Sequence, residues 1–418
     1  MKKESFIYKY IRSIMGFSLI FICPNPLTAA ELSQAVPLET EKSAYAEPWQ
    51  RYTQWKQTDW KDFNTLSNAK ASPPVAKTQT VETPVQGNPD QGKELVADRK
   101  RGGSCLACHV LPEETLPGNV GPDLSTIGTW KRTDEYLFNY IYDPRQFNPK
   151  TAMPPWGIHQ IFSREEIKDL VAYLKTLKSP TQFPNEVDDP AKRPLPVEDR
   201  DNLDPFENPA MASIDVAKDL FVKIGTKEQS CQSCHEKPEK VFKTWAVTMP
   251  KFSPRLKKVI GIEEFVTRHA RATTQADYPL QSQENLALST YLRFLANGQA
   301  IAVQADDEKT QAAIKHGEAL TQQKIGQLNF ACVDCHATHA NQWIRGQRLA
   351  SFKGMLDHFP TYRTSRDEIW DIQKRFQWCG VAIRANELPP GSPEYGDLEM
   401  YLTFSNNGQL LSVPGIRH

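Results

Sequence analysis

The pattern Cys-x-x-Cys-His occurs three times in this chain, at 105–109, 231–235 and 332–336, and takes up six of its eight cysteines. In such a motif the two thiols bind a haem covalently, and the histidine ligates the haem iron. The sequence therefore predicts three covalently bound haem c groups. A zinc site or a dithiol redox site is the alternative, since Cys-x-x-Cys alone serves both. The predicted attachment residues are Cys105, Cys108, Cys231, Cys234, Cys332 and Cys335, with His109, His235 and His336 as iron ligands.

A further thiol, Cys379, stands outside these motifs, and we expect Cys23 to be removed with a leader peptide. An unpaired cysteine in an oxidising compartment is a liability unless it is buried, ligated or chemically used. Arg375 precedes Cys379 by four residues, so on a helix the two side chains would share one face. A guanidinium favours a thiolate and can grip an oxyanion through forked hydrogen bonds. The pair is a candidate reactive site, with a buried structural cysteine as the alternative.

Met153, in the segment TAMPPWG at 151–157, is the candidate second ligand of the first haem. It follows His109 by 44 residues and is flanked by prolines. A thioether stabilises ferrous iron and raises the reduction potential, which suits an electron acceptor. The alternatives are a methionine that fills the core and ligation by the nearby His159, for which a surface histidine is the simpler interpretation.

The first 30 residues predict a secretory signal peptide. Basic residues precede an apolar stretch at 14–22, and small residues at 28–30 precede the expected cleavage after Ala30. The apolar stretch is shorter than the ~20 residues of a membrane helix, so we expect a soluble periplasmic protein without a membrane span. The remaining chain would carry 46 basic and 49 acidic side chains, which gives no sign of nucleic-acid binding.

Length and motif spacing predict one small domain per haem. The expected fold class is all-α, with three class I cytochrome c-like domains whose buried porphyrins supply much of each core. Apolar residues at helical spacing predict helices at 165–177, 284–295 and 395–404. The expected units are 31–89 (a short helix near Trp49, Trp55 and Trp60, then a flexible Pro/Thr/Ala-rich tether), 90–180 (first haem domain), 181–204 (Pro-rich acidic linker), 205–300 and 301–418 (second and third haem domains).

The first haem domain resembles SoxX, the mono-haem subunit of the bacterial sulfur-oxidising cytochrome SoxXA. This similarity lies in GPDL at 121–124, NPKTAMPPWG at 148–157 and EEIKDLVAYLKTL at 165–177. From about Asp204 onward the chain is similar to the SoxA subunit. The resemblance covers about three quarters of the chain and implies a natural fusion of two subunits that are usually separate. The most distinctive segments are QWIRGQ at 342–347, RFQWCG at 375–380 and GSPEYGDLEMYL at 391–402.

The resemblance implies roles for Arg375 and Cys379. SoxA carries an arginine four residues before a cysteine that ligates its active-site haem, often as a persulfide, and these two residues match those positions. Cys379 is thus the implied distal ligand of the haem held at 332–336. The implied activity is that of an L-cysteine S-thiosulfotransferase, which joins thiosulfate oxidatively to a cysteine of a SoxYZ-like carrier protein. Two electrons would pass through the SoxX-like haem to an acceptor cytochrome c. Rival ligands to Cys379 are His339, Met355 and His358.

The middle haem departs from the family pattern. Two-haem SoxA proteins imply a cysteine ligand here too, yet no cysteine stands between Cys234 and Cys332, and His269 occupies the position that matches. We therefore expect a bis-histidine haem with a relay or structural role, with Met249 as the alternative ligand.

Two other functions stay open at this point. A multi-haem electron carrier without sulfur chemistry would have little use for a thiolate-ligated haem beside an arginine. A two-haem peroxidase fused to a cytochrome would require a haem with an open coordination position.

Overall fold

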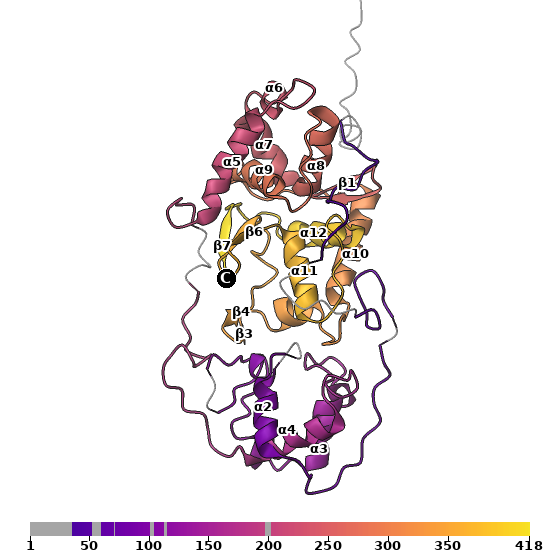
Figure 1. The fold of residues 1–418 in the computed structure, drawn as a ribbon, viewed down its shortest axis with the longest axis vertical. Coiled ribbons are helices and arrows are strands. Elements are labelled where there is room, and N and C mark those ends of the chain that lie inside the picture. Colours follow the sequence, from indigo (N-terminus) through magenta and orange to yellow (C-terminus); the bar gives the residue numbers. More distant parts are fainter. Residues whose placement is uncertain (1–35, 52–59, 71, 101–103, 113–114, 197–201) are drawn as a thin grey trace, which may run out of the picture.

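The structure is a computed structural model that describes residues 36–51, 60–70, 72–100, 104–112, 115–196 and 202–418. The predicted signal peptide and most of the predicted short helix near Trp55 lie outside these residues. The helices of residues 89–176 form one end of the molecule, those of 205–300 form the other end, and the carboxy-terminal elements lie between them (Figure 1). Within the described ranges, no helix is long and apolar enough to cross a membrane.

The first unit packs α2 (Pro89–Ala97) and α3 (Asp134–Tyr142) against α4 (Arg164–Thr176). Helix α4 begins at Ser163, whose side chain accepts a hydrogen bond from the Glu166 backbone, while Glu166 accepts one from the Ser163 backbone. Helix α2 crosses α4 so closely that a Cβ at Gly92 would lie 2.1 Å from the carbonyl oxygen of Asp169. Glycine is therefore required at this crossing. The buried apolar face of α4, at helical spacing as predicted, consists of Ile167, Leu170, Val171 and Leu174.

The middle and last units follow one plan. Each has a helix, a haem motif, a two-stranded hairpin and two further helices, and equivalent elements begin 110 residues apart from the hairpin onward. The middle unit contains α5 (Ala212–Val222), α6 (Cys231–Cys234), α7 (Pro238–Trp245), β1 (Lys251–Ser253), β2 (Lys258–Ile260), α8 (Ile262–Thr273) and α9 (Gln283–Phe294). The last unit contains α10 (Glu308–Gln322), β3 (Trp343–Ile344), β4 (Gln347–Arg348), β5 (Thr361–Arg363), β6 (Glu368–Trp370), α11 (Ile372–Ala382), α12 (Pro393–Ser405) and β7 (Gly415–Arg417).

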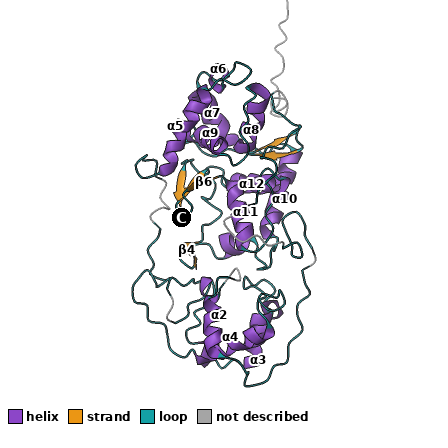
Figure 2. Ribbon diagram, viewed as in Figure 1, coloured by secondary structure: helices purple, strands orange, loops and turns teal. Residues whose placement is uncertain are grey.

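The expectation of an all-α fold is wrong in detail, because three small sheets accompany the helices (Figure 2). Strands β1 and β2 pair antiparallel, as do β3 and β4, and β5 lies between antiparallel β6 and parallel β7. Each strand has only two or three residues. Strands this short cannot show the sustained alternation of apolar and polar residues from which a sheet is predicted.

The segment predicted as a flexible tether instead lies along α3. Backbone amides of Ala76 and Gln79 donate to Asp143 (2.9 Å) and Asn139 (2.7 Å), and that of Val85 donates to Asp134 (2.8 Å). These side chains accept hydrogen bonds from backbone amides that are not paired with a strand. The segment is therefore docked on α3, although its composition is typical of a linker.

The first and last units meet where Arg193, from the Pro-rich segment, lies over the ring of Trp343 at 4.8 Å. The Arg193 guanidinium also donates to the carbonyl oxygens of Arg345 (2.7 Å) and Pro117 (3.1 Å). Asn119 of the first unit pairs with the backbone of Trp343, accepting at 2.8 Å and donating at 3.0 Å. The segment QWIRGQ, distinctive in the sequence, thus forms part of an internal interface.

Candidate functional site

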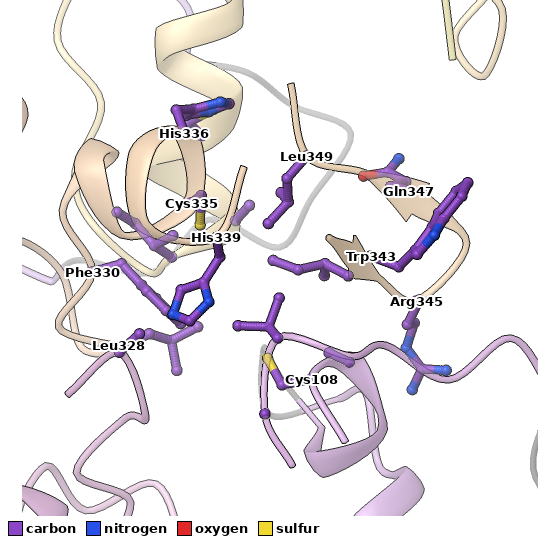
Figure 3. Close-up of a pocket in the computed structure, with 18 of the residues that line it drawn as sticks. Cys108, Leu328, Phe330, Cys335, His336, His339, Trp343, Arg345, Gln347 and Leu349 are labelled. Carbon is purple, nitrogen blue, oxygen red and sulfur yellow. The ribbon is translucent and has the colours of Figure 1, made fainter. Parts of the chain in front are cut away.

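One connected cavity of about 1890 Å³ lies between the first and last units. The first and third haem motifs both line it, and Figure 3 shows Cys108 and Cys335 on facing sides. Burial raises the pKa of Cys335 to about 12, and the nearby thiols of Cys379 and Cys108 add to the shift. Because a pocket for one small ligand usually has 300–1,000 Å³, this cavity has room for two prosthetic groups side by side.

The histidines of these two motifs are held in a defined orientation. Nδ1 of His109 hydrogen-bonds the carbonyl oxygen of Pro122 (2.8 Å), and Nδ1 of His336 that of Ala350 (2.8 Å). Since a carbonyl only accepts, each Nδ1 carries the proton and Nε2 is left to bind a metal. A Cβ at Gly121 would lie 2.2 Å from the His109 ring, so glycine lets the backbone pass close behind this imidazole. These features fit haem ligation.

Met153 and His159 have different surroundings. Met153 lines the cavity together with His109. His159 is buried at 3 % exposure, and its Nδ1 donates to the carbonyl oxygen of Gln327 (2.7 Å), while Gln327 donates to its carbonyl oxygen (2.8 Å). The interpretation of His159 as a surface residue is therefore wrong: it connects the first unit to the last, and the described residues that line the cavity do not include it.

The middle motif lies apart from this cavity, as its residues do not belong to the described lining. The rings of His235 and His269 face one another with centroids 6.2 Å apart. Metal–imidazole bonds are about 2 Å long, so this separation fits one iron ligated from both sides. Met249 is instead buried at 2 % exposure in the apolar core. Phe265 stacks on His269, with centroids 5.0 Å apart and an interplanar angle of 13°.

Cys379 is the eighth residue of α11, a helix capped by the preceding Asp371, whose side chain accepts a hydrogen bond from the Lys374 backbone. Its thiol lines the shared cavity and hydrogen-bonds His336. Burial acts to raise the pKa of this thiol, but the charge of Arg375, the hydrogen-bonding contact with His336 and the charge of Arg363 outweigh it and lower the pKa to about 7. Burial raises the pKa of Cys332, another thiol that lines the cavity, to about 12. The lower pKa of Cys379 is therefore due to its charged neighbours and not to its place in the cavity.

Three further arginines, Arg363 beside Cys379 and Arg366 and Arg417 beside Arg363, were not predicted from the sequence. All three line the cavity. Burial lowers the pKa of Arg363 to about 9, and the positive charges of Arg375, Arg417 and Arg366 act in the same direction. Arg375 and Arg363 thus act directly on the thiol, and Arg366 and Arg417 lie close to Arg363, an arrangement suited to an anion.

The internal repeat would have revealed part of this cluster. In the middle unit, the positions that match Arg363, Arg366 and Arg375 are held by Ser253, Leu256 and Phe265. An alignment of the two units shows that the last unit has arginines where the middle unit has uncharged residues. The spacing within a single haem motif gives no such information.

The rival ligands of the third haem have other partners. Nδ1 of His339 lies 2.7 Å from Oε1 of Gln342, and Nδ1 of His358 lies 2.8 Å from Oδ1 of Asp357. Met355 packs against an apolar cluster with Leu356. All three rivals line the cavity, but it is Cys379 that hydrogen-bonds His336.

The zinc interpretation gains no support, since no group of three or more His, Cys, Asp or Glu side chains among the described residues is arranged to hold a metal ion. Paired thiols beside an oriented imidazole, at the wall of a large apolar cavity, define a c-type cytochrome. Two cytochrome c domains are recognised in the chain. Residues 216–301 match the family described as SoxA/TsdA, cytochrome c domain, and residues 87–174 match cytochrome C oxidase, cbb3-type, subunit III.

Among individual proteins, the chain is similar to the L-cysteine S-thiosulfotransferase subunit SoxA. It is 28% identical to that of Pseudaminobacter salicylatoxidans over 216 residues, 51% of this chain and 75% of the relative. It is 33% identical to that of Allochromatium vinosum over 153 residues, 36% of this chain and 54% of the relative. The crystal structure of SoxXA from P. pantotrophus matches with 27% identity and a TM-score of 0.47, covering 51% of this chain and 80% of that chain.

This chain therefore carries a SoxA/TsdA cytochrome c domain and, outside it, a second cytochrome c domain of another type. Such domains imply covalently bound haem c. Since the SoxA relatives account for about half of the chain, a fusion of a SoxA-like part with a further cytochrome agrees with the coverage.

Proposed function

We propose that this protein is a periplasmic three-haem cytochrome that joins thiosulfate to a cysteine of a SoxYZ-like carrier protein. One thiosulfate and one carrier thiol would form a sulfur–sulfur bond, releasing one proton and two electrons. The products would be the carrier S-thiosulfonate and two electrons, which bound haems would carry to an acceptor cytochrome c. The observation that carries the proposal is the thiol of Cys379 beside His336, Arg375 and Arg363.

The residues around Cys379 suit each requirement of this reaction. Thiosulfate is a dianion, and its sulfonate end can be gripped by Arg375 and Arg363 through charge-assisted hydrogen bonds. The lowered pKa of Cys379 favours the thiolate, the form that binds a metal or attacks sulfur. A haem bound at 332–336, with His336 and Cys379 as its axial ligands, would supply one-electron acceptance next to the anion.

The shared cavity supports the proposed electron route. The thiols of Cys108 and Cys335 lie near enough for one to affect the pKa of the other. A haem on each motif would therefore have its neighbour directly beside it, and electrons would pass from the third haem to the first. Met153, as the second ligand of the first haem, would raise its potential and draw electrons toward it.

The middle haem would take no part in the chemistry. His269, its proposed second ligand beside His235, has the apolar Phe265 where Cys379 has Arg375. The positions of the middle unit that match Arg363, Arg366 and Arg375 have no positively charged side chain that could bind an anion. A structural or relay role follows for this haem.

A pair of variants tests the proposal. Cys379→Ala should abolish formation of the carrier adduct, measured by intact mass of the carrier, while all three haems stay attached. His269→Met, at the equivalent position of the middle unit, is the matched control and should retain adduct formation. Normal turnover by Cys379→Ala would overturn the proposal and leave an electron carrier without its own sulfur chemistry.

A further inference from the structure

An amino-terminal arm, residues 37–44, lies against the middle unit, although the next helix in the described part of the chain is α2 of the first unit. In Figure 1 the indigo segment runs beside α8 and then descends along the molecule. The Glu39 backbone donates to the carbonyl oxygen of Arg268 (3.0 Å), and the Leu280 backbone donates to that of Ala44 (2.8 Å). Ala44 is buried at 3 % exposure, and Leu38 packs against the core of the middle unit. The arm is thus docked at both ends.

Arg268 clamps the arm from the middle unit. Its Nη1 donates to the carbonyl oxygens of Glu39 (3.0 Å) and Lys42 (2.9 Å), and its Nε donates to the buried carboxylate of Glu264 (2.7 Å). Lys258 lies 2.8 Å from the same carboxylate. Hydrogen bonds from a charged donor are stronger than neutral ones, so the arm backbone has a fixed place on α8.

This placement brings the carbonyl oxygen of Pro37 to His269. The Nδ1 of His269 donates to it at 2.8 Å, which leaves Nε2 free of a proton in a ring whose centroid lies 6.2 Å from that of His235. His109 and His336 obtain the same kind of acceptor from their own units, 13 and 14 residues further along the chain. His269 obtains its acceptor from 232 residues upstream.

We propose that the arm is a positioning element for the middle haem, an inference that rests on the proposed ligation of this haem by His269. The Pro37 carbonyl fixes the tautomer and orientation of His269 and makes its Nε2 a better donor to iron. A thiolate such as that of Cys379 carries its own charge and has no second nitrogen to orient. An imidazole at the equivalent position depends on an outside acceptor, and the arm provides it.

Cyanide binding to the ferric holoprotein tests this inference, because cyanide competes with His269 for the iron. Deletion of residues 37–44 removes the acceptor, and Leu38→Asp weakens the docking of the arm without shortening the chain. Loss of such a partner typically weakens a metal ligand 10–100-fold, so cyanide should bind the middle haem about 10- to 100-fold more tightly in the deletion variant. Low-temperature electron paramagnetic resonance distinguishes the three haems.

The matched control is Lys42→Gln, which changes an exposed side chain of the arm and keeps the backbone oxygen that Arg268 holds. It should bind cyanide as the unaltered protein does. Wild-type cyanide affinity in both the deletion variant and Leu38→Asp, with haem content unchanged by mass, would overturn the role of the arm.

His269→Met separates this inference from the function proposed above. A changed resonance signal of the middle haem in this variant supports ligation by His269. An unchanged signal would overturn ligation and the role of the arm together, whereas the function proposed above is decided separately by adduct formation in Cys379→Ala.

Discussion

His269 and Cys379 occupy the same position, the eighth residue, of the equivalent helices α8 and α11. The two helices follow equivalent hairpins, and each side chain approaches the histidine of its own haem motif. One unit has an imidazole beside the apolar Phe265, the other a thiol beside Arg375. The same fold therefore presents two different candidate iron ligands, and the charges around the thiol mark the copy in which we propose that the chemistry takes place.

Arg375→Gln should lower kcat/KM for thiosulfate by about 10- to 100-fold. Hydrogen bonds to charged groups contribute about 1.5–3 kcal/mol, and glutamine cannot reproduce the forked cation. Steady-state kinetics with varied thiosulfate measures the effect. Lys374→Gln is the control, since this neighbouring lysine pairs with Glu368 at 2.7 Å. Equal losses in both variants would contradict a specific role for Arg375.

Met153→His should lower the midpoint potential of the first haem by about 0.1 V or more. Replacing a thioether by an imidazole removes the ligand that favours ferrous iron, and axial ligands shift haem potentials over a wide range. Spectroelectrochemistry of the holoprotein measures this. We expect Met153 to be the second ligand of this haem because Met153 and His109 line the same cavity. An unchanged potential would show that Met153 is not the ligand.

Arg193→Ala should weaken the contact between the first and last units by about 1–3 kcal/mol. The variant loses charge-assisted hydrogen bonds to two backbone oxygens and the contact with the Trp343 ring. Because the chain links the two units, their high effective concentration limits full separation. Faster proteolysis within 181–204 is the expected readout, and proteolysis at the wild-type rate would contradict it. Lys192→Ala, an exposed neighbour paired with Asp189, is the control.

Glu399→Gln should make the protein more stable at pH 8 than the unaltered chain, with little difference at pH 5. Burial, followed by the charge of Glu263, raises the pKa of Glu399 to about 8. Its Oε2 accepts from Gln373 at 3.1 Å, and Arg293 lies 4.0 Å from Oε1, too far to offset the burial. A carboxyl group whose folded-state pKa is raised stabilises the fold below its unfolded pKa, and this contribution is lost as the pH rises through the folded value.

The expected gain at pH 8 is on the order of 2 kcal/mol, because one pKa unit corresponds to 1.36 kcal/mol and neighbouring carboxyl groups share the titration. Thermal unfolding at both pH values measures it. Glu394→Gln, in the first turn of the same helix, should show no such pH-dependent gain. A parallel shift at both pH values would contradict the account.

Much of the site could be predicted because its residues recur in short motifs. Spacing, resemblance and elimination predicted the three haem motifs, Arg375, Cys379 and His269, and the structure brings His269 to His235 and Cys379 to His336. Helix α4 was predicted to within one residue at each end, because its apolar side chains recur strictly at helical spacing.

Features that depend on long-range contacts could not be predicted. Arg363 reaches Cys379 through β5, a strand of three residues with no pattern of its own. The segment at 72–88 has the composition of a linker, and only the side chains of α3 hold it in place. The carbonyl oxygen of Pro37 accepts a hydrogen bond from His269, 232 residues away in the sequence. No local sequence pattern in either segment predicts this contact.

The most direct test of the central claim incubates the purified holoprotein with thiosulfate, a SoxYZ-like carrier and oxidised cytochrome c, and follows carrier mass and cytochrome reduction together. The account predicts that the carrier gains the mass of one thiosulfate group for every two cytochromes reduced. Reduction of cytochrome c without any adduct on the carrier would contradict it.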